Sequence, residues 1–330
     1  MKNSFLIHFI FFRILPKNKI RIYLIVLSFF SFIIGGCNTN TLQGYSAIDL
    51  TPSPLVPLDP TTVIETAVAV IDTGIARHEN LDESLLLFKD FINHNPEPYD
   101  DNGHGTEVSG IISGNGIGVA KKYSGVVPGQ KLIVLKAFDN DGNGDLFALS
   151  DSIDWIIENK QAYKIKLVCM SFGFDVSPIF NNSVMENLIE RLHQNGIIII
   201  TSAGNNGEEN GEITIPGTYS GVLTVGSLNY QPLIDKNISS AEISDFSSTK
   251  INGVSSSIKP ELYAPGEQII TTSAEQKNAY TVVSGTSYSA ALVCGQIAWI
   301  MNHYPHLTSE EIIDFVIKNR ENRILDIPVE

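Results

Sequence analysis

Residues that could carry out acyl transfer stand at the ends of apolar stretches of this sequence. In chain order they are Asp72, His104, Asn205 and Ser287. A serine hydroxyl is a weak nucleophile and needs a neighbouring base, which an imidazole provides near neutral pH. A carboxylate can orient that imidazole, and an amide with a main-chain N–H can hold the oxyanion of a tetrahedral intermediate. These residue types suffice for nucleophilic catalysis if the fold brings them together.

Ser287 alone does not establish this chemistry, because serine is also a common helix N-cap. The apolar residues that follow it, up to Met301, recur with the spacing of a buried helix. Residues 285–289 read Gly-Thr-Ser-Tyr-Ser, so the G-x-S-x-G turn of esterases is missing here. Asp72 is more informative, because it ends the apolar stretch 67–71 and a buried carboxylate is costly unless it is paired.

Apolar stretches and helical patterns alternate along the chain and predict the elements that must position these side chains. Strands are expected at 67–72, 131–138, 166–172, 196–204 and 221–227, and helices at 105–114, 148–159 and 183–195. Unbroken apolar strands separated by helices are typical of a parallel sheet covered on both faces. We therefore predict one doubly wound α/β domain over residues 64–325. Function in such sheets gathers at the carboxyl ends of the strands, where Asp72, Ser171 and Asn205 fall.

Four motifs resemble those of the subtilisin-like serine peptidases. They are VIDTG around Asp72, NGHGT around His104, AGNNG around Asn205 and SGTSYSA around Ser287, in the family's order. The resemblance covers residues 66–322 and implies a mostly parallel sheet with helices on both faces. It also implies an endopeptidase that works through an acyl-enzyme. Asp72 would orient His104, which acts as base and then as acid. Ser287 would attack, and Asn205 with the Ser287 N–H would hold the oxyanion.

The same resemblance assigns a substrate-binding strand and predicts the partners. Ser171, Phe172 and Gly173 would pair with the substrate backbone, with Phe172 facing a side-chain subsite. The alternative is that these residues only end a strand. No cofactor is expected for catalysis, the substrates would be proteins or peptides, and we expect a monomer.

The chain departs from the family pattern close to two of these motifs. Residues 107–110 read Glu-Val-Ser-Gly where many members have His-Val-Ala-Gly, and Tyr288 stands where Met is usual. These positions support the reacting residues, so we expect them to tune the rate. The rival hypothesis is a catalytically silent lipoprotein of the same fold that binds a peptide or protein partner. The intact set of reacting residues argues against it.

The first 36 residues have the composition of a signal peptide. Basic residues precede the apolar stretch 22–34, which is short for a membrane span of about twenty residues. Small residues before Cys37 resemble the lipobox of bacterial lipoproteins, which implies lipidation of Cys37. That anchor would hold the protein to a membrane outside the cytoplasm, on the periplasmic side or at the cell surface, and an uncleaved transmembrane anchor is the alternative. Residues 37–63 contain prolines and no strand or helix period, which indicates a tether.

Three further features restrict the ligands and partners of this chain: its net charge, one acidic loop and its cysteines. The formal net charge of −14 argues against nucleic acid as a partner. Residues 139–150 approach the pattern of an EF-hand loop, but Ser150 stands where calcium needs a bidentate Glu. We therefore expect an ordinary turn and no metal in the catalytic site, while a structural calcium ion elsewhere stays open. Cys169 and Cys294 lie in apolar stretches and are expected to be buried, with a disulfide between them unsupported.

Overall fold

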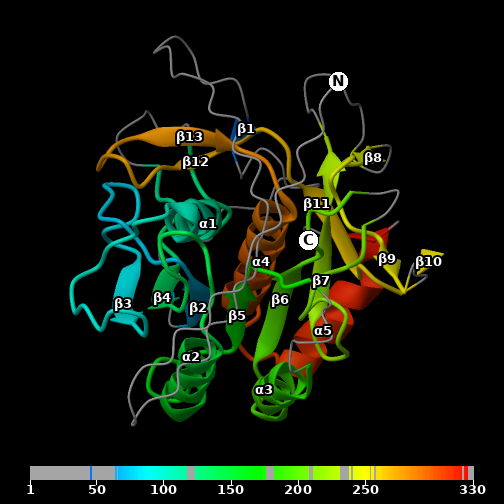
Figure 1. The fold of residues 1–330 in the computed structure, drawn as a ribbon, viewed down its shortest axis with the longest axis horizontal. Helices are drawn as coiled ribbons and strands as arrows, with labels where there is room; N and C mark the ends of the chain where they lie inside the picture. The colour runs from blue at the N-terminus through cyan, green and yellow to red at the C-terminus, as the bar shows by residue number, and fades with distance from the viewer. Residues whose placement is uncertain are drawn as a thin grey trace, which may run out of the picture.

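A mostly parallel sheet runs through the molecule (Figure 1). The computed structural model describes residues 45–46, 64, 66–116, 123–175, 182–207, 211–230, 238, 241–252, 254–255, 258–321 and 323–325. The sheet has ten strands in the order β14-β15-β11-β7-β6-β5-β2-β4-β3, and β8 also pairs with β7. All neighbours from β3 to β15 are parallel, whereas β14 and β8 are antiparallel to their partners.

Five of the ten strands fall on the apolar stretches that predicted them, and the other five were not predicted. The strands are β2 (Ala67–Asp72), β3 (Leu85–Asp90), β4 (Lys131–Lys136), β5 (Leu167–Met170), β6 (Ile198–Ser202), β7 (Leu223–Asn229), β8 (Glu242–Ile243), β11 (Leu262–Pro265), β14 (Arg320–Glu321) and β15 (Ile324–Leu325). β2 matches its prediction residue for residue, β4, β5 and β6 are shorter than predicted, and β7 lies two residues later than predicted. The strands without a prediction are β3, β8, β11, β14 and β15.

Helices cover both faces of the sheet, which confirms the predicted doubly wound α/β class. The helices are α1 (His104–Ser113), α2 (Leu146–Asn159), α3 (Asn182–Gln194), α4 (Thr286–His303) and α5 (Ser309–Lys318). Val68 and Val70 of β2 belong to the core with α1, α4 and α5, whereas Ala69 and Ile71 belong to the core with α2 and α3. Successive strand side chains point to opposite faces, so an all-apolar β2 can serve both cores. Figure 1 shows α2 and α3 together at the lower edge and α4 beside the central strands.

Helix α4 is buried along almost its whole length. All its residues from Thr286 to Asn302 are buried, and it packs against β5, β6, β7 and β11. A helix that is apolar all round is stable only inside the protein, so the sequence after Ser287 requires this central position. Ser287 is therefore placed at the beginning of the most deeply buried helix, beside the ends of the central strands.

Smaller sheets lie at the side of the domain. β1 (Tyr45–Ser46) pairs in parallel with β12 (Ile269–Thr272), which pairs with β13 (Tyr280–Val283), and β9 (Lys250–Ile251) pairs with β10 (Val254–Ser255). The predicted tether, for which no strand was expected, thus contributes a two-residue strand. Main-chain pairing with β12 forms this strand, and the side chains around it have no strand pattern. The predicted signal peptide, Cys37 and the rest of the predicted tether lie outside the described residues. Among the helices that the structure describes, none has the length and hydropathy that a membrane span requires.

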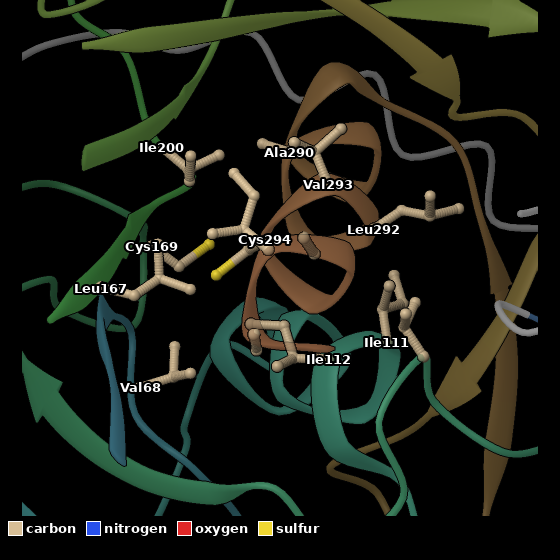
Figure 2. Packing of buried hydrophobic residues seen from close by; sticks show 14 of the residues in the cluster. Val68, Ile111, Ile112, Leu167, Cys169, Ile200, Ala290, Leu292, Val293 and Cys294 are labelled. Atoms are coloured by element: carbon tan, nitrogen blue, oxygen red, sulfur yellow. The ribbon is translucent and has the colours of Figure 1, made fainter. Parts of the chain in front are cut away.

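Cys169 of β5 and Cys294 of α4 are fully buried in the same apolar core, as the sequence predicted, and both are free thiols (Figure 2). Burial raises the pKa of Cys294 well above its ordinary value, and the adjacent Cys169 adds to this effect. Because the thiolate is the reactive form, neither cysteine of the native protein should react with iodoacetamide at pH 8. Peptide mapping by mass spectrometry should find both alkylated only after denaturation. Alkylation of either residue in the native protein would contradict the packing.

Candidate active site

The carboxyl end of β2 and the beginning of α1 bring Asp72 and His104 together. Asp72 is 2% exposed and His104 is 8% exposed. The Asp72 Oδ1 to His104 Nδ1 distance is 2.8 Å, and the Thr73 main-chain N–H also donates to Oδ1 at 2.7 Å. Since a carboxylate accepts, Nδ1 carries the hydrogen and Nε2 of the neutral ring is the proton acceptor. The pair predicted from the sequence is therefore formed, with the tautomer that a general base needs.

Asp100 fixes the loop that leads into α1. Its Oδ1 accepts hydrogen bonds from the Thr73 hydroxyl at 2.9 Å and the Gly103 N–H at 2.8 Å. Its Oδ2 accepts from the N–H and the hydroxyl of Thr106, at 2.9 and 2.7 Å. Asp100 thus joins the residue after Asp72 to the first turn of the helix that carries His104. The sequence reasoning missed this residue, although an Asp shortly before a helix is a known signal for capping its N-terminus.

Close backbone contact completes the positioning of α1. A side chain on Gly105 would place its Cβ 2.2 Å from the Gly74 carbonyl oxygen, closer than any real contact. Only glycine lets the first turn of α1 approach the chain as it leaves β2. The glycine after His104 is therefore a condition for the distance between Asp72 and His104.

Ser287 is the second residue of α4 and is 5% exposed. Its Oγ donates a hydrogen bond to the Ser171 carbonyl oxygen at 2.8 Å, and the Ser171 hydroxyl donates back to the Ser287 carbonyl oxygen at 3.1 Å. These reciprocal bonds join the carboxyl end of β5 to the beginning of α4. The His104 ring lies 5.7 Å from the ring of Tyr288, the residue after Ser287. The beginnings of α1 and α4, which carry His104 and Ser287, therefore lie next to each other.

Asn205 lies just past β6 with its amide held in one orientation. Its Oδ1 accepts hydrogen bonds from the N–H and the hydroxyl of Thr286, at 3.0 and 2.9 Å. Because both Thr286 groups donate, the amide oxygen must face them and Nδ2 must face away. The Ser287 N–H belongs to the first turn of α4, which the helix itself leaves without an acceptor. Nδ2 and this N–H are two donors at the positive end of a helix, which suits a developing oxyanion.

Comparison with known proteins agrees with this geometry. A model of the subtilase family matches residues 64–326. The chain belongs to the subtilase family. It is 31% identical over 278 residues to serine protease AprX of Bacillus subtilis (strain 168), covering 78% of this chain and 62% of that protein. It is 32% identical over 247 residues to a thermostable alkaline protease of Halalkalibacterium halodurans, covering 74% of this chain and 59% of that protein.

Solved structures show the same subtilase fold. A cold adapted subtilisin-like serine proteinase superposes with a TM-score of 0.64 at 25% identity, covering 85% of this chain and 93% of that one. The S41 psychrophilic protease superposes with a TM-score of 0.66 at 26% identity, covering 77% and 82%. The chain spans about three fifths of the length of the first curated relatives it matches.

The electrostatics of this subtilase favour a charged His104. Burial alone lowers the pKa of His104, but the charge and hydrogen bond of Asp72 outweigh it. Glu107 and Asp100 add to the increase, and the pKa rises to about 9. An imidazolium at this position is therefore stabilised mainly by Asp72, which is the state that forms when a base has accepted a proton.

The predicted substrate-binding residues directly follow β5. Ser171 is buried, Phe172 and Gly173 are half-buried, and Phe174 exchanges main-chain hydrogen bonds with Ile215. A Cβ on Gly173 would lie 2.0 Å from the Thr214 hydroxyl oxygen, so packing against Thr214 requires glycine here whether or not the segment binds substrate. The Phe172 ring packs on Phe138, with centroids 4.7 Å apart. The role of this segment in binding substrate stays a prediction.

The acidic loop after β4 is an ordinary turn. Asp139 Oδ1 accepts hydrogen bonds from the N–H groups of Asp141 and Asn143, both at 2.9 Å. A carboxylate that caps its own loop in this way closes a turn, as the sequence predicted. Within the described part of the chain, no group of three or more His, Cys, Asp or Glu side chains has an arrangement suited to a metal ion.

Lys136 is another residue whose role the sequence did not reveal. It is fully buried at the end of β4, and its Nζ donates to Asp101 at 2.7 Å, to the Phe138 carbonyl at 2.8 Å and to the Thr73 carbonyl. A buried ammonium group needs such partners to be tolerated. Lys136 thus braces the chain on both sides of the reacting pair, next to Asp72 and next to the loop before α1.

Proposed function

We propose that this chain is a monomeric serine endopeptidase that hydrolyses peptide bonds through Asp72, His104 and Ser287. The observation that carries the proposal is the 2.8 Å bond between Asp72 and His104 beside the beginning of α4, where Ser287 stands. Membership of the subtilase family and similarity to solved subtilisin-like proteinases support it.

The geometry suggests how the residues act. Rotation about χ1 frees the Ser287 hydroxyl from the Ser171 carbonyl, so that Oγ can attack a substrate carbonyl while His104 Nε2 takes the proton. Asp72 stabilises the imidazolium, and Asn205 Nδ2 with the Ser287 N–H holds the oxyanion. His104 then gives the proton to the leaving amine, which leaves an acyl-enzyme on Ser287. Water activated by His104 attacks this ester, and the acid product leaves with the free hydroxyl restored.

We further propose that the segment of Ser171, Phe172 and Gly173 binds the substrate backbone as an added strand. The segment continues β5 at the active-site end of the sheet, and Ser171 already contacts Ser287 through main-chain oxygens. Main-chain pairing of this kind would hold an extended peptide with its scissile bond at Ser287. Phe172, half-buried beside Phe138, would then contact a substrate side chain.

An internally quenched peptide with both ends blocked tests the proposed activity. We expect the protein to cleave it at an internal bond, and a serine-directed sulfonyl fluoride to abolish the cleavage. Blocked ends exclude exopeptidases, and a matched ester substrate measures esterase activity separately. A folded protein that binds peptides and cleaves none of a broad set would contradict the proposal and favour the silent binding protein.

Asn205→Ala should lower kcat by ~10²–10³-fold, the size of the effect known for such an amide in subtilisin. The amide contacts Thr286, and its proposed role is to hold the oxyanion, which forms only after attack, so KM should change far less than kcat. Asn206→Ala is the matched control, because Asn206 binds Asp175 and Glu212 at the surface instead. Steady-state kinetics on the quenched peptide measures both. Equal effects of the two substitutions would contradict the assignment of Asn205.

We also propose that the protein is held outside the cytoplasm by lipid on Cys37. The motif that ends in Gly35-Gly36-Cys37 after an apolar stretch supports this proposal. Growth with a labelled fatty acid should label the full chain, and Cys37→Ser should abolish both the label and membrane association. Membrane association that survives Cys37→Ser would contradict the lipid anchor and favour the uncleaved transmembrane segment.

A further inference from the structure

Two side chains that depart from the usual subtilase pattern, one on the helix of His104 and one on the helix of Ser287, contact each other. Glu107 lies in the first turn of α1, three residues after His104, and Tyr288 directly follows Ser287 in α4. The Tyr288 hydroxyl donates a hydrogen bond to Glu107 Oε2 at 2.6 Å. This bond links residues 181 positions apart, so each departure supplies the partner of the other.

Both members of the pair lie near the imidazole of His104. Residues three apart on a helix share a face, so Glu107 and His104 lie on the same side of α1. The Tyr288 ring is buried and lies 5.7 Å from the His104 ring. The main-chain carbonyl of Glu107 also accepts a hydrogen bond from the Thr271 hydroxyl of β12 at 2.7 Å, which fixes the backbone of α1 at this point.

We propose that Glu107, held by the Tyr288 hydroxyl, is a positioning residue of the reacting site. It ties the helix that carries His104 to the helix that carries Ser287, and it supplies a second negative charge that stabilises the imidazolium formed in the reaction. This inference rests on the proposed peptidase function.

The ionisation of Glu107 supports the proposal. Burial raises the pKa of Glu107 to about 7, although the Tyr288 hydrogen bond and the charge of His104 pull it down. The other charged groups that face it are Asp100 in the loop before α1 and Asp72 at the end of β2, and both raise it. Above about pH 7 the carboxylate is therefore charged, and in this range it adds to the rise of the His104 pKa to about 9.

The sign of the effect on catalysis follows from these charges. His104 must be neutral to accept a proton, so kcat/KM of the wild type should rise with pH until about pH 9. Glu107→Gln removes a negative charge that favours the imidazolium, so His104 should become neutral at a lower pH. A unit charge at helix i, i+3 spacing is expected to lower the pH at which kcat/KM stops rising by ~0.5 pH units or more. Tyr288→Phe releases the carboxylate and should give a smaller shift in the same direction.

Two readouts on the full chain test the inference. The first is the pH dependence of the rate of reaction with a fluorophosphonate, for wild type, Glu107→Gln and Tyr288→Phe. The second is the titration of the His104 imidazole followed by NMR, assigned from its loss in His104→Ala, which does not require activity. The control is Glu158→Gln on α2, at the other face of the sheet, which should leave both titrations unchanged.

The outcomes separate this inference from the proposed function. A downward shift of both titrations in Glu107→Gln, with no shift in Glu158→Gln, is the expected result. An unchanged NMR titration in a folded Glu107→Gln variant would overturn the inference, whatever the activity. A shifted NMR titration together with an unreactive wild type would contradict the proposed function and leave the coupling between Glu107 and His104 standing.

Discussion

Ser287→Ala is expected to reduce kcat for peptide hydrolysis by about 10⁶-fold, the size of the effect known for subtilisin. Alanine removes the only atom of the side chain that can form the acyl-enzyme, so the remaining groups can act only on water. The lost hydroxyl donates to the Ser171 carbonyl, but the reciprocal bond from the Ser171 hydroxyl stays. KM should therefore stay within a few-fold of wild type.

Steady-state kinetics on the quenched peptide measures this loss, after the folding and the mass of each variant have been checked. Ser284→Ala is the matched control, because Ser284 is exposed and its hydroxyl accepts a hydrogen bond from the Gln268 N–H. It should keep nearly full activity. Hydrolysis by Ser287→Ala within about tenfold of wild type would show that another residue is the nucleophile.

Asp72→Asn should lower kcat by about 10⁴-fold, the size known for this change in other Asp-His-Ser enzymes. In the native site Oδ1 is hydrogen-bonded to both the Thr73 N–H and His104 Nδ1. An amide oxygen of the new Asn at this place lacks the negative charge that stabilises the imidazolium. An NH2 group at this place donates to Nδ1, so the imidazole must carry its hydrogen on Nε2, where it can no longer accept the proton of Ser287.

The double variant Asp72→Asn/Ser287→Ala sharpens this prediction. Residues that act as one unit are not additive, so the double variant should be no slower than Ser287→Ala alone. Asp82→Asn is the control, since Asp82 forms an exposed ion pair with Arg77 away from the site. Additive losses in the double variant would mean that Asp72 and Ser287 act independently, which contradicts a shared proton path.

Local patterns in the sequence were sufficient to predict five neighbouring strands of the sheet, β7, β6, β5, β2 and β4, but not the strands on either side of them. The stretch AVAVID predicts β2 to the residue, because an unbroken apolar strand bounded by a polar residue has few other interpretations. Asp72, Ser171 and Asn205 were predicted to meet because parallel strands share a carboxyl edge. The structure places Ser171 and Asn205 against the beginning of α4 and Asp72 against His104 at the beginning of α1. Helix α5 was missed although the capping box of Thr308 and Glu311 announced its beginning.

Other parts of the site depend on contacts between distant residues and could not be predicted. Glu107 and Tyr288 looked like two separate departures from a pattern, and only the packing of α1 on α4 shows that they bond to each other. Lys136 ends an apolar strand and has no local signal for its burial, since its partners include Asp101 and Thr73 from elsewhere in the chain. Such contacts follow from the tertiary structure and produce no periodic pattern of residue types in the sequence.

The most direct test of the account is to locate the adduct of a fluorophosphonate probe on the full chain by mass spectrometry. We expect one adduct per chain, on the peptide that contains Ser287, and its loss in both Ser287→Ala and His104→Ala. That result would show a serine made reactive by a neighbouring imidazole. An adduct on another serine, or an unmodified wild-type protein that is folded, would contradict the assignment of Asp72, His104 and Ser287 as the catalytic residues.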